Sequence, residues 1–189
     1  MNQRKILFLV SVFILSRVPV LCADTYAIDP GHSSVSFKIR HVVGNVRGSF
    51  KGLKGTIEFN EADPSASAVR VRIDTAGVDT GIGKRDDHLR SADFFDAAKY
   101  PEITFISKKV DAKNSQLIGD LTMHGVTREV VLDYTYAGLA QNKKGETVIG
   151  GSGQTRLNRR DFGIHYDPSG LTVGNDVAVD LDIEAVKKG

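Results

Sequence analysis

The sequence predicts an all-β protein that folds as a single antiparallel barrel with an apolar inner face. Apolar and polar residues alternate along most of residues 26–186, and only residues 83–99 depart from this pattern. Alternation with a period of two marks strands buried on one face, and such strands are typical of antiparallel sheets. The N-terminus resembles an export signal, so the folded domain is expected to span residues 24–189.

The N-terminal segment, residues 1–23, is predicted to be a cleaved signal peptide. Arg4 and Lys5 precede an apolar stretch at residues 6–15, and a small residue stands at the expected cleavage site. A membrane anchor is the weaker interpretation, because Arg17 interrupts the apolar stretch before the roughly 20 residues that a spanning helix needs. The mature protein is therefore expected to be exported.

Cys22 opens a further alternative, a lipoprotein, but Leu21 before it is larger than the small residue that lipoprotein processing prefers. Cys22 is also the only cysteine, so the mature domain has no disulfide and depends on its core. Removing Arg4, Lys5 and Arg17 lowers the 25 basic side chains to 22, against 23 acidic ones, a net charge of −1. This balance gives no indication of a nucleic-acid partner.

Each expected strand places its apolar residues on one face. In the first clear example, Val35, Phe37 and Ile39 alternate with Ser36 and Lys38. The same period predicts half-buried strands further along the chain. Their inward-facing residues are Ile57 and Phe59; Val69, Val71 and Ile73; Ile103 and Phe105; Leu117, Gly119, Leu121 and Met123; Val130, Leu132, Tyr134 and Tyr136; and Val177, Val179, Leu181, Ile183 and Ala185.

The connections between these strands contain turn residues. His124-Gly125 fits a two-residue hairpin, since glycine accepts positive φ freely and histidine enters this region more often than most residues. Residues 142–145 and 167–170 are further turn candidates.

Short helical segments are expected near residues 84–99. Residues 84–90 predict two helical turns, and Asp93 is a candidate cap for a second short helix that ends before Pro101. These helices would lie across the mouth or flank of the barrel.

A series of motifs resembles the YceI-like family of lipocalin-like, polyisoprenoid-binding proteins. The opening motif is residues 26–37, Tyr-Ala-Ile-Asp-Pro-Gly-His-Ser-Ser-Val-Ser-Phe, followed by His41. Five further motifs follow in order and cover nearly all of the mature chain. They are residues 46–50, 85–96, 100–105, 119–128 and 158–163.

The resemblance implies an eight-stranded, lipocalin-like barrel whose elongated apolar cavity holds a long isoprenoid or similar lipid. A barrel of about eight strands is just wide enough to enclose one small ligand. The resemblance also implies the bacterial periplasm and, in some members, an association with quinone or cytochrome b redox systems and with stress responses. The oligomeric state is left open.

The expected function is that of an exported binding protein that encloses a polyprenyl or quinone-like chain for sequestration or transport, with no cofactor besides this lipid. The alternative is a stress-related structural or interaction protein with a closed core and no physiological lipid, because a packed barrel core shows the same alternation. Strand facing predicts which side chains line the cavity. They are Phe37, Ile39, Phe59, Val71, Phe105, Leu121 and Leu181.

Histidines offer few sharper predictions. His41 continues the inward phase of its strand and is the candidate for a polar contact with a lipid head group; a hydrogen-bonded structural histidine is the alternative. His32 beside Asp29 is expected to tie down a turn. His88 lies near several aspartates, but no histidine ligand pair accompanies it, so no metal site is predicted.

Catalytic motifs are not apparent, and no catalytic residue is predicted. The glycine-rich stretch at residues 150–153 is not a Gly-x-Ser-x-Gly elbow, because Gln154 occupies the closing position. Neither a phosphate-binding loop nor a dinucleotide fingerprint occurs. The chain is therefore expected to bind rather than to catalyse.

Overall fold

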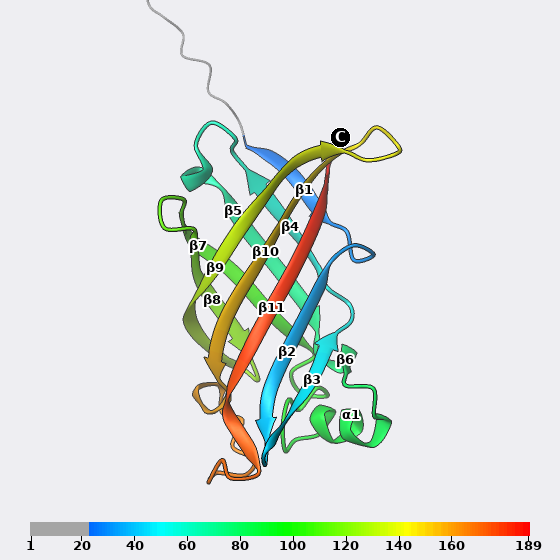
Figure 1. The fold of residues 1–189 in the computed structure, drawn as a ribbon, viewed down its shortest axis with the longest axis vertical. Helices are drawn as coiled ribbons and strands as arrows, with labels where there is room; N and C mark the ends of the chain where they lie inside the picture. Colours follow the sequence, from blue (N-terminus) through cyan, green and yellow to red (C-terminus); the bar gives the residue numbers. More distant parts are fainter. Residues whose placement is uncertain (1–22) are drawn as a thin grey trace, which may run out of the picture.

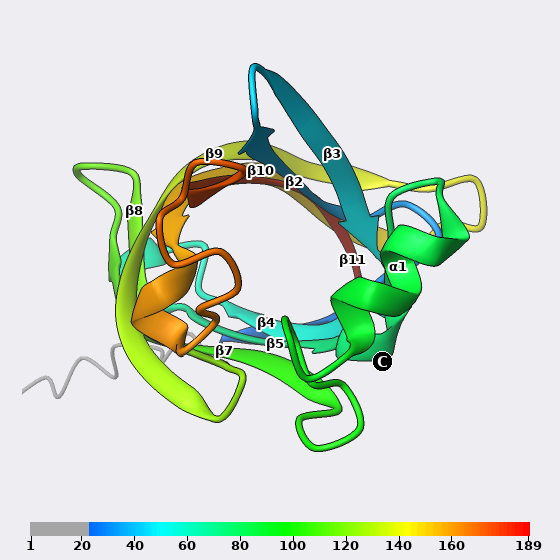
Figure 2. The same ribbon diagram turned by 90° about the horizontal axis from the view of Figure 1, so that it is seen from below.

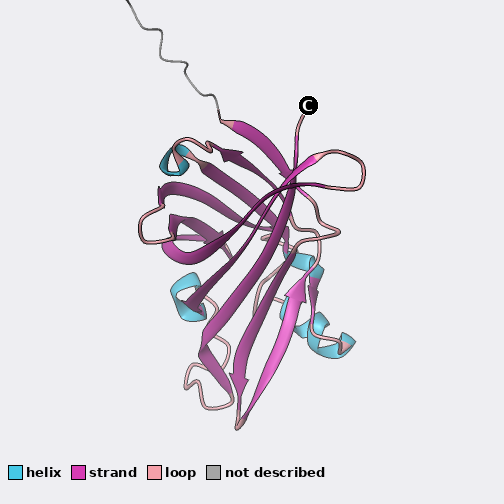
Figure 3. Ribbon diagram, turned by 45° about the horizontal axis from the view of Figure 1, so that its top comes forward, coloured by secondary structure: helices cyan, strands magenta, loops and turns pink. Residues whose placement is uncertain are grey.

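The computed structural model describes residues 23–189, which form one extended sheet with short helices at its edges (Figure 3). The expected signal peptide, including Cys22, lies outside the described residues except for Ala23. The strands are β1 Asp24–Ile28, β2 Ser34–His41, β3 Gly44–Phe50, β4 Lys54–Phe59, β5 Ala68–Asp74, β6 Val78–Asp79, β7 Glu102–Asp111, β8 Gln116–Met123, β9 Val126–Gln141, β10 Thr147–Asn158 and β11 Val173–Lys187. The helices are α1 Gly83–Arg90 and three 3-10 helices, η1 Pro64–Ala66, η2 Thr75–Gly77 and η3 Arg159–Phe162.

Eight of these strands close into an antiparallel barrel, as the sequence predicted. Their order is β1-β4-β5-β7-β8-β9-β10-β11, and β11 then pairs with β1 to complete the ring (Figure 2). Because successive side chains of a β-strand point to opposite faces of the sheet, the side chains of each strand alternate between the barrel interior and solvent.

Strand β11 has two partners along the same edge. Its residues 185–187 pair with β1, while its residues 173–182 pair with β2. Strand β2 pairs with β3, and β3 pairs with β6. These three strands, β2, β3 and β6, form a wing beside the barrel wall (Figure 1). The barrel is therefore closed by β1 at one end and flanked by this wing at the other.

A packed apolar core lies where β11 pairs with β1, at the end of the barrel that we call the closed end. Ala185 is fully buried where β11 meets β1 and β10, opposite Ile28 on one side and Ile149 on the other. A larger side chain at Ala185 would compete for space with both neighbours, since protein interiors are close-packed. The buried residues of this core are Tyr26, Ile28, Val35, Leu53, Ile73, Ile103, Ile149 and Ala185.

The predicted turns are confirmed. His124 and Gly125 form the two-residue connection between β8 and β9, with φ values of 52° and 73°. Both residues thus adopt the positive φ that a tight hairpin with the twist of its strands requires. The turns at residues 142–145 and 167–170 each close with a hydrogen bond from the last residue to the first carbonyl.

The predicted helix at residues 84–90 is also confirmed as α1, but the second helix is not. The segment after α1 is a run of turns in which the Asp93 N–H donates to the Ser91 hydroxyl. Asp96 has a φ of 46°, and a left-handed residue at this point interrupts any right-handed helix. Within residues 23–189, the chain forms no helix long and apolar enough to cross a membrane.

Tyr26 on β1 is 2% exposed and belongs to the core cluster. We expect Tyr26→Ala to lower the free energy of unfolding by about 3–5 kcal/mol, because it leaves a large cavity beside β11. Urea denaturation measures this change. Thr25→Ala, at the half-buried neighbour, is the control and should cost much less. Equal stabilities of the two variants would contradict this assignment of the core.

Candidate functional site

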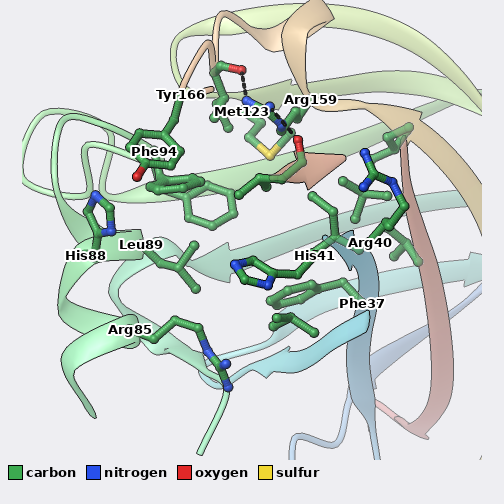
Figure 4. Close-up of a pocket in the computed structure, with 18 of the residues that line it drawn as sticks. Phe37, Arg40, His41, Arg85, His88, Leu89, Phe94, Met123, Arg159 and Tyr166 are labelled. Carbon is green, nitrogen blue, oxygen red and sulfur yellow. Dashed lines mark hydrogen bonds between the residues drawn. The ribbon is translucent and has the colours of Figure 1, made fainter. Parts of the chain in front are cut away.

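The end of the barrel beside the wing contains a cavity of about 250 Å³ (Figure 4). Its walls come from β2 and β3 of the wing, from β11, from α1 and the turns after it, and from the segment that joins β10 to β11. Most of the lining atoms are apolar. The lining residues are Phe37, Ile39, Arg40, His41, Val46, Phe50, Arg85, His88, Leu89, Phe94, Phe95, Met123, Leu157, Arg159, Ile164, Tyr166, Thr172, Val173, Val177 and Val179.

The structure divides the predicted lining residues into two groups. Phe37, Ile39 and His41, all on β2, line the cavity together. The other five are not among the lining residues: Phe105 is buried, and four half-buried side chains pack against the core cluster. These four are Phe59, Val71, Leu121 and Leu181.

The boundary between cavity and core is made of side chains that belong to both. Phe50, Phe95, Met123 and Val179 line the cavity and also pack against the core cluster. The rings of Phe50 and Phe95 meet edge to face with their centroids 5.4 Å apart. These four side chains therefore mark the boundary between the cavity and the core cluster.

Sequence reasoning missed the part of the lining that lies outside the strands. Leu89 on α1, Phe94 and Phe95 in the following turns, and Ile164 and Tyr166 near η3 all line the cavity. Period-two alternation identifies the faces of strands, so it does not predict which residues of other segments line a cavity. The available signal was an adjacent phenylalanine pair, at residues 94–95, in an otherwise polar stretch.

Helix α1 is fixed against the wing by a buried carboxylate. Asp86, which is 6% exposed, accepts hydrogen bonds from the backbone N–H and the hydroxyl of Thr80, at 2.8 and 2.5 Å. The Thr80 hydroxyl oxygen in turn accepts from Arg85 Nε at 2.7 Å. These bonds hold the Arg85 guanidinium at the cavity wall.

Arg159 organises the opposite side of the cavity. Its guanidinium is almost fully buried and donates to four backbone carbonyl oxygens, those of Gly174, Ile164, Asp167 and Val173, at 2.9–3.1 Å. Burial lowers the pKa of Arg159, because desolvation disfavours the charged form. A single side chain thus fixes the path of residues 163–174 along the cavity.

Asp167 stabilises the same segment, residues 163–174, from the solvent side. Its carboxylate accepts from the Ser169 hydroxyl and from the backbone N–H groups of Val173 and Thr172. Led by the Ser169 bond, these hydrogen bonds lower the pKa of Asp167 from 3.8 to about 2, since they favour the ionised form.

An aromatic cluster joins the two sides across the cavity. The ring centroids of His88 and Tyr166 are 5.1 Å apart, and Phe94 lies within 5.0 Å of both. The His88 imidazole also forms a hydrogen bond with Asp93, at 2.9 Å. This cluster connects the turns after α1 with the segment after η3, which are distant in the sequence.

The histidines at the other positions have distinct surroundings. His41 lines the cavity but is exposed, so it lies at the mouth rather than among apolar side chains as the strand phase suggested. His32 bonds Asp29 at 2.7 Å and ties down a turn, as predicted. This hydrogen bond raises the pKa of His32 and lowers that of Asp29. Glu184 lies nearby, so these three side chains are the closest approach to a metal site among residues 23–189.

The lining residues are mostly apolar, with a few arginines, histidines and one tyrosine. Of the described side chains that line the cavity, none is a carboxylate, serine, cysteine or lysine, and the titratable groups are arginines, histidines and one tyrosine. Apolar walls with a few fixed polar groups at the mouth are the usual construction of a small-molecule binding pocket. Fold and cavity together define a lipocalin-like barrel open at one end.

Comparisons with known proteins place this barrel in a family. The model of the YceI-like domain matches residues 26–185. A UPF0312 protein of Vibrio cholerae is 36% identical over 193 aligned residues, which cover 98% of this chain and all of that protein. The chain belongs to the YceI-like family.

Solved structures show the same fold. The YceI protein of Campylobacter jejuni is 36% identical, with a TM-score of 0.70 over 78% of this chain and 88% of that one. A polyisoprenoid binding domain from Saccharophagus degradans is 17% identical, with a TM-score of 0.69 over 86% of this chain and 98% of that one. At this low identity the second likeness shows the fold alone.

The role of Arg159 predicts a large effect on stability. We expect Arg159→Met to lower the free energy of unfolding by about 3 kcal/mol or more, because it leaves several buried carbonyl oxygens without a donor. Urea denaturation provides the measurement, and Arg160→Met, at an exposed neighbour, is the control. An Arg159→Met protein as stable as the control would show that the four hydrogen bonds do not hold the segment.

The low pKa of Asp167 predicts a specific acid sensitivity. Since its folded pKa lies below the unfolded value of 3.8, the carboxylate stabilises the fold above pH 3.8, and this contribution is lost as the pH falls toward about 2. The thermal midpoint of Asp167→Asn should therefore fall less steeply than that of the unaltered protein across this pH range. Parallel curves for the two proteins would be the contrary result.

Proposed function

We propose that this protein binds an isoprenoid-type lipid, a polyprenyl or quinone-like chain, and that it sequesters or carries this lipid outside the cytoplasm. The observation that supports the proposal most directly is the apolar cavity of about 250 Å³ at one end of the barrel. The name of the Saccharophagus degradans domain, a structural neighbour, points to the same class of ligand. The proposal is that of a binding protein rather than an enzyme.

The physical basis of binding would be burial of hydrocarbon. Each methylene removed from water contributes about 0.8 kcal/mol, and the effect has no directional requirement. Side chains such as Phe37, Ile39, Val177 and Val179 present the apolar surface that such a chain needs. Because this contact is non-directional, chain length and branching would be selected by the shape of the cavity.

The size of the cavity sets a limit on the chain. A volume of about 250 Å³ lies just below the roughly 300–1,000 Å³ of typical ligand pockets. We expect a short prenyl chain to need little change in the cavity. A longer chain would have to displace the boundary side chains, chiefly Phe95 and Met123, and extend toward the closed end. Methionine adapts readily to such a change, because its side chain is unbranched and flexible.

The mouth offers polar contacts for a head group. His41 is exposed there, and Arg85 is held at the wall by its two hydrogen bonds to Thr80. Both side chains can donate hydrogen bonds, so they would bind a hydroxyl, carbonyl or anionic oxygen of a head group. His41 thus keeps the head-group role suggested by its strand position, with Arg85 as a second contact.

The cellular setting is proposed on the sequence and the family resemblance. The N-terminal signal favours export to the periplasm. A soluble carrier there would let a water-insoluble chain pass between membranes. A membrane-associated quinone or cytochrome b redox system, active under stress, would be a suitable source or recipient of such a lipid.

Lipid uptake by single variants tests this function. We expect native mass spectrometry to show a one-to-one adduct of geranylgeraniol with the protein, and we expect Phe37→Asp to abolish it by burying an unpaired charge in the cavity wall. Ile39→Trp should also prevent uptake by filling the cavity while leaving its walls apolar. Val131→Trp, on the exposed outer surface, is the control and should bind normally.

Unchanged adducts in both cavity variants would contradict the site. A protein that is empty when purified from its own host and that fails to take up added prenyl lipid would favour the alternative, a structural or interaction protein without a lipid.

A further inference from the structure

Large apolar side chains are exposed at the open end of the barrel. Val43 is 99% exposed and Val42 51% exposed, at the tip of the β2–β3 hairpin, and Leu171 is 76% exposed in the loop before β11. We call these three residues the apolar tips. Both segments project from the same end of the molecule, at the bottom of the view in Figure 1. Isolated exposed apolar residues are ordinary, but a group around a cavity mouth indicates an interaction site.

The apolar tips are joined in one rigid unit. Arg40 donates from Nη1 to the carbonyl oxygens of Val42 and Leu171, at 2.8 and 3.1 Å, and from Nη2 to that of Gly170. The backbone N–H of Val42 donates to the Thr172 carbonyl at 2.7 Å. The hairpin and the loop are therefore fixed side by side, although about 130 residues separate them in the sequence.

The hairpin tip breaks the usual rules of turn composition. Val42 has a φ of 51°, in the left-handed region that β-branched residues rarely adopt. The β8–β9 hairpin of the same protein uses His124 and Gly125 at the equivalent place, which is far better suited to such a turn. Two exposed valines contribute little to folding here. Local strain without a structural benefit is typical of functional sites.

The apolar tips continue directly into the cavity lining. Arg40 and His41 line the cavity immediately before Val42, and Thr172 and Val173 line it immediately after Leu171. A hydrocarbon chain that leaves the cavity would thus pass His41 and Thr172 at the mouth and then reach the tips.

Unpaired positive charges surround this end. Arg40, Lys84 and Arg85 take part in no salt bridge within residues 23–189. Ile82, 53% exposed, adds a further apolar residue just before α1. Apolar side chains that project beyond cations without a carboxylate partner complement a bilayer, whose phosphate groups lie above its hydrocarbon.

We propose that the open end docks on the surface of a lipid bilayer, with Val42, Val43 and Leu171 inserted among the head groups and Arg40, Lys84 and Arg85 near the phosphates. This inference rests on the proposed function, because docking would let a lipid move between bilayer and cavity without entering water. Separate projecting tips fit a deformable lipid surface better than a protein partner, which requires a continuous complementary face.

Vesicle flotation with matched variants tests the docking surface. The protein, in the form that its host produces, is mixed with vesicles of phosphatidylethanolamine and phosphatidylglycerol. We expect the unaltered protein to float, and Val43→Asp and Leu171→Asp to bind at least about tenfold more weakly, because each replaces an inserted apolar side chain by a charge. Val131→Asp, at a valine exposed on the barrel wall, is the control and should float normally. The unaltered protein and all variants carry the same N-terminus, so differences in vesicle binding between them do not come from it.

A further variant separates docking from folding. Val42→Gly removes the strain at φ 51° together with one apolar tip, so its thermal midpoint should be equal or higher while its binding to vesicles falls. Unchanged flotation of Val43→Asp and Leu171→Asp would overturn the docking surface. So would a protein that does not float but forms a dimer that Val43→Asp dissociates, because the tips would then face a second copy.

Uptake of geranylgeraniol from detergent, measured by native mass spectrometry on the same variants, keeps the two proposals apart. Normal uptake by Val43→Asp with loss of flotation supports docking. Tip-dependent flotation of a protein that takes up no prenyl lipid would sustain the docking surface and refute the cavity function.

Discussion

One edge of β11 pairs with two strands in succession, first β2 and then β1, and the rest of the structure depends on this shared pairing. Residues 185–187 pair with β1 and close the barrel, whereas residues 173–182 pair with β2 and carry the wing. Each strand edge can hydrogen-bond to one neighbour at a time. Where β1 ends, the ring therefore opens, and the space between the wing and the opposite wall must be filled by other segments.

Two buried charged side chains make that filling possible. Asp86 anchors α1 through Thr80 on one side of the opening, and on the other side Arg159 donates to two carbonyl groups of the loop and to two at the start of β11. Both are satisfied by local polar groups, so the high cost of burying a charge is offset by hydrogen bonds. Segments without regular structure are thereby held rigid, and a cavity persists between them where a sheet alone would leave a cleft.

The interior is consequently divided into a packed half and a hollow half. At the closed end, the side chains of facing strands fill the barrel, as they do in most small barrels. At the open end, the same apolar alternation on β2 and β11 lines the cavity. A packed core and an apolar cavity thus occupy opposite parts of one barrel, and Phe95 and Met123 lie at the boundary between them.

The sequence by itself determined the all-β class, the inward phase of the strands, the tight turn at His124-Gly125 and helix α1, because all of these follow from local periodicity and from the φ preferences of single residues. It also placed Phe37, Ile39 and His41 on one strand face. Only the tertiary structure decided that these three line one cavity with Leu89, Phe94 and Tyr166, and that Phe105 and Leu181 are not among the lining residues. The reason is physical: strand alternation specifies which side chains face inward, whereas the width of the barrel at each level depends on pairings between segments far apart in the chain.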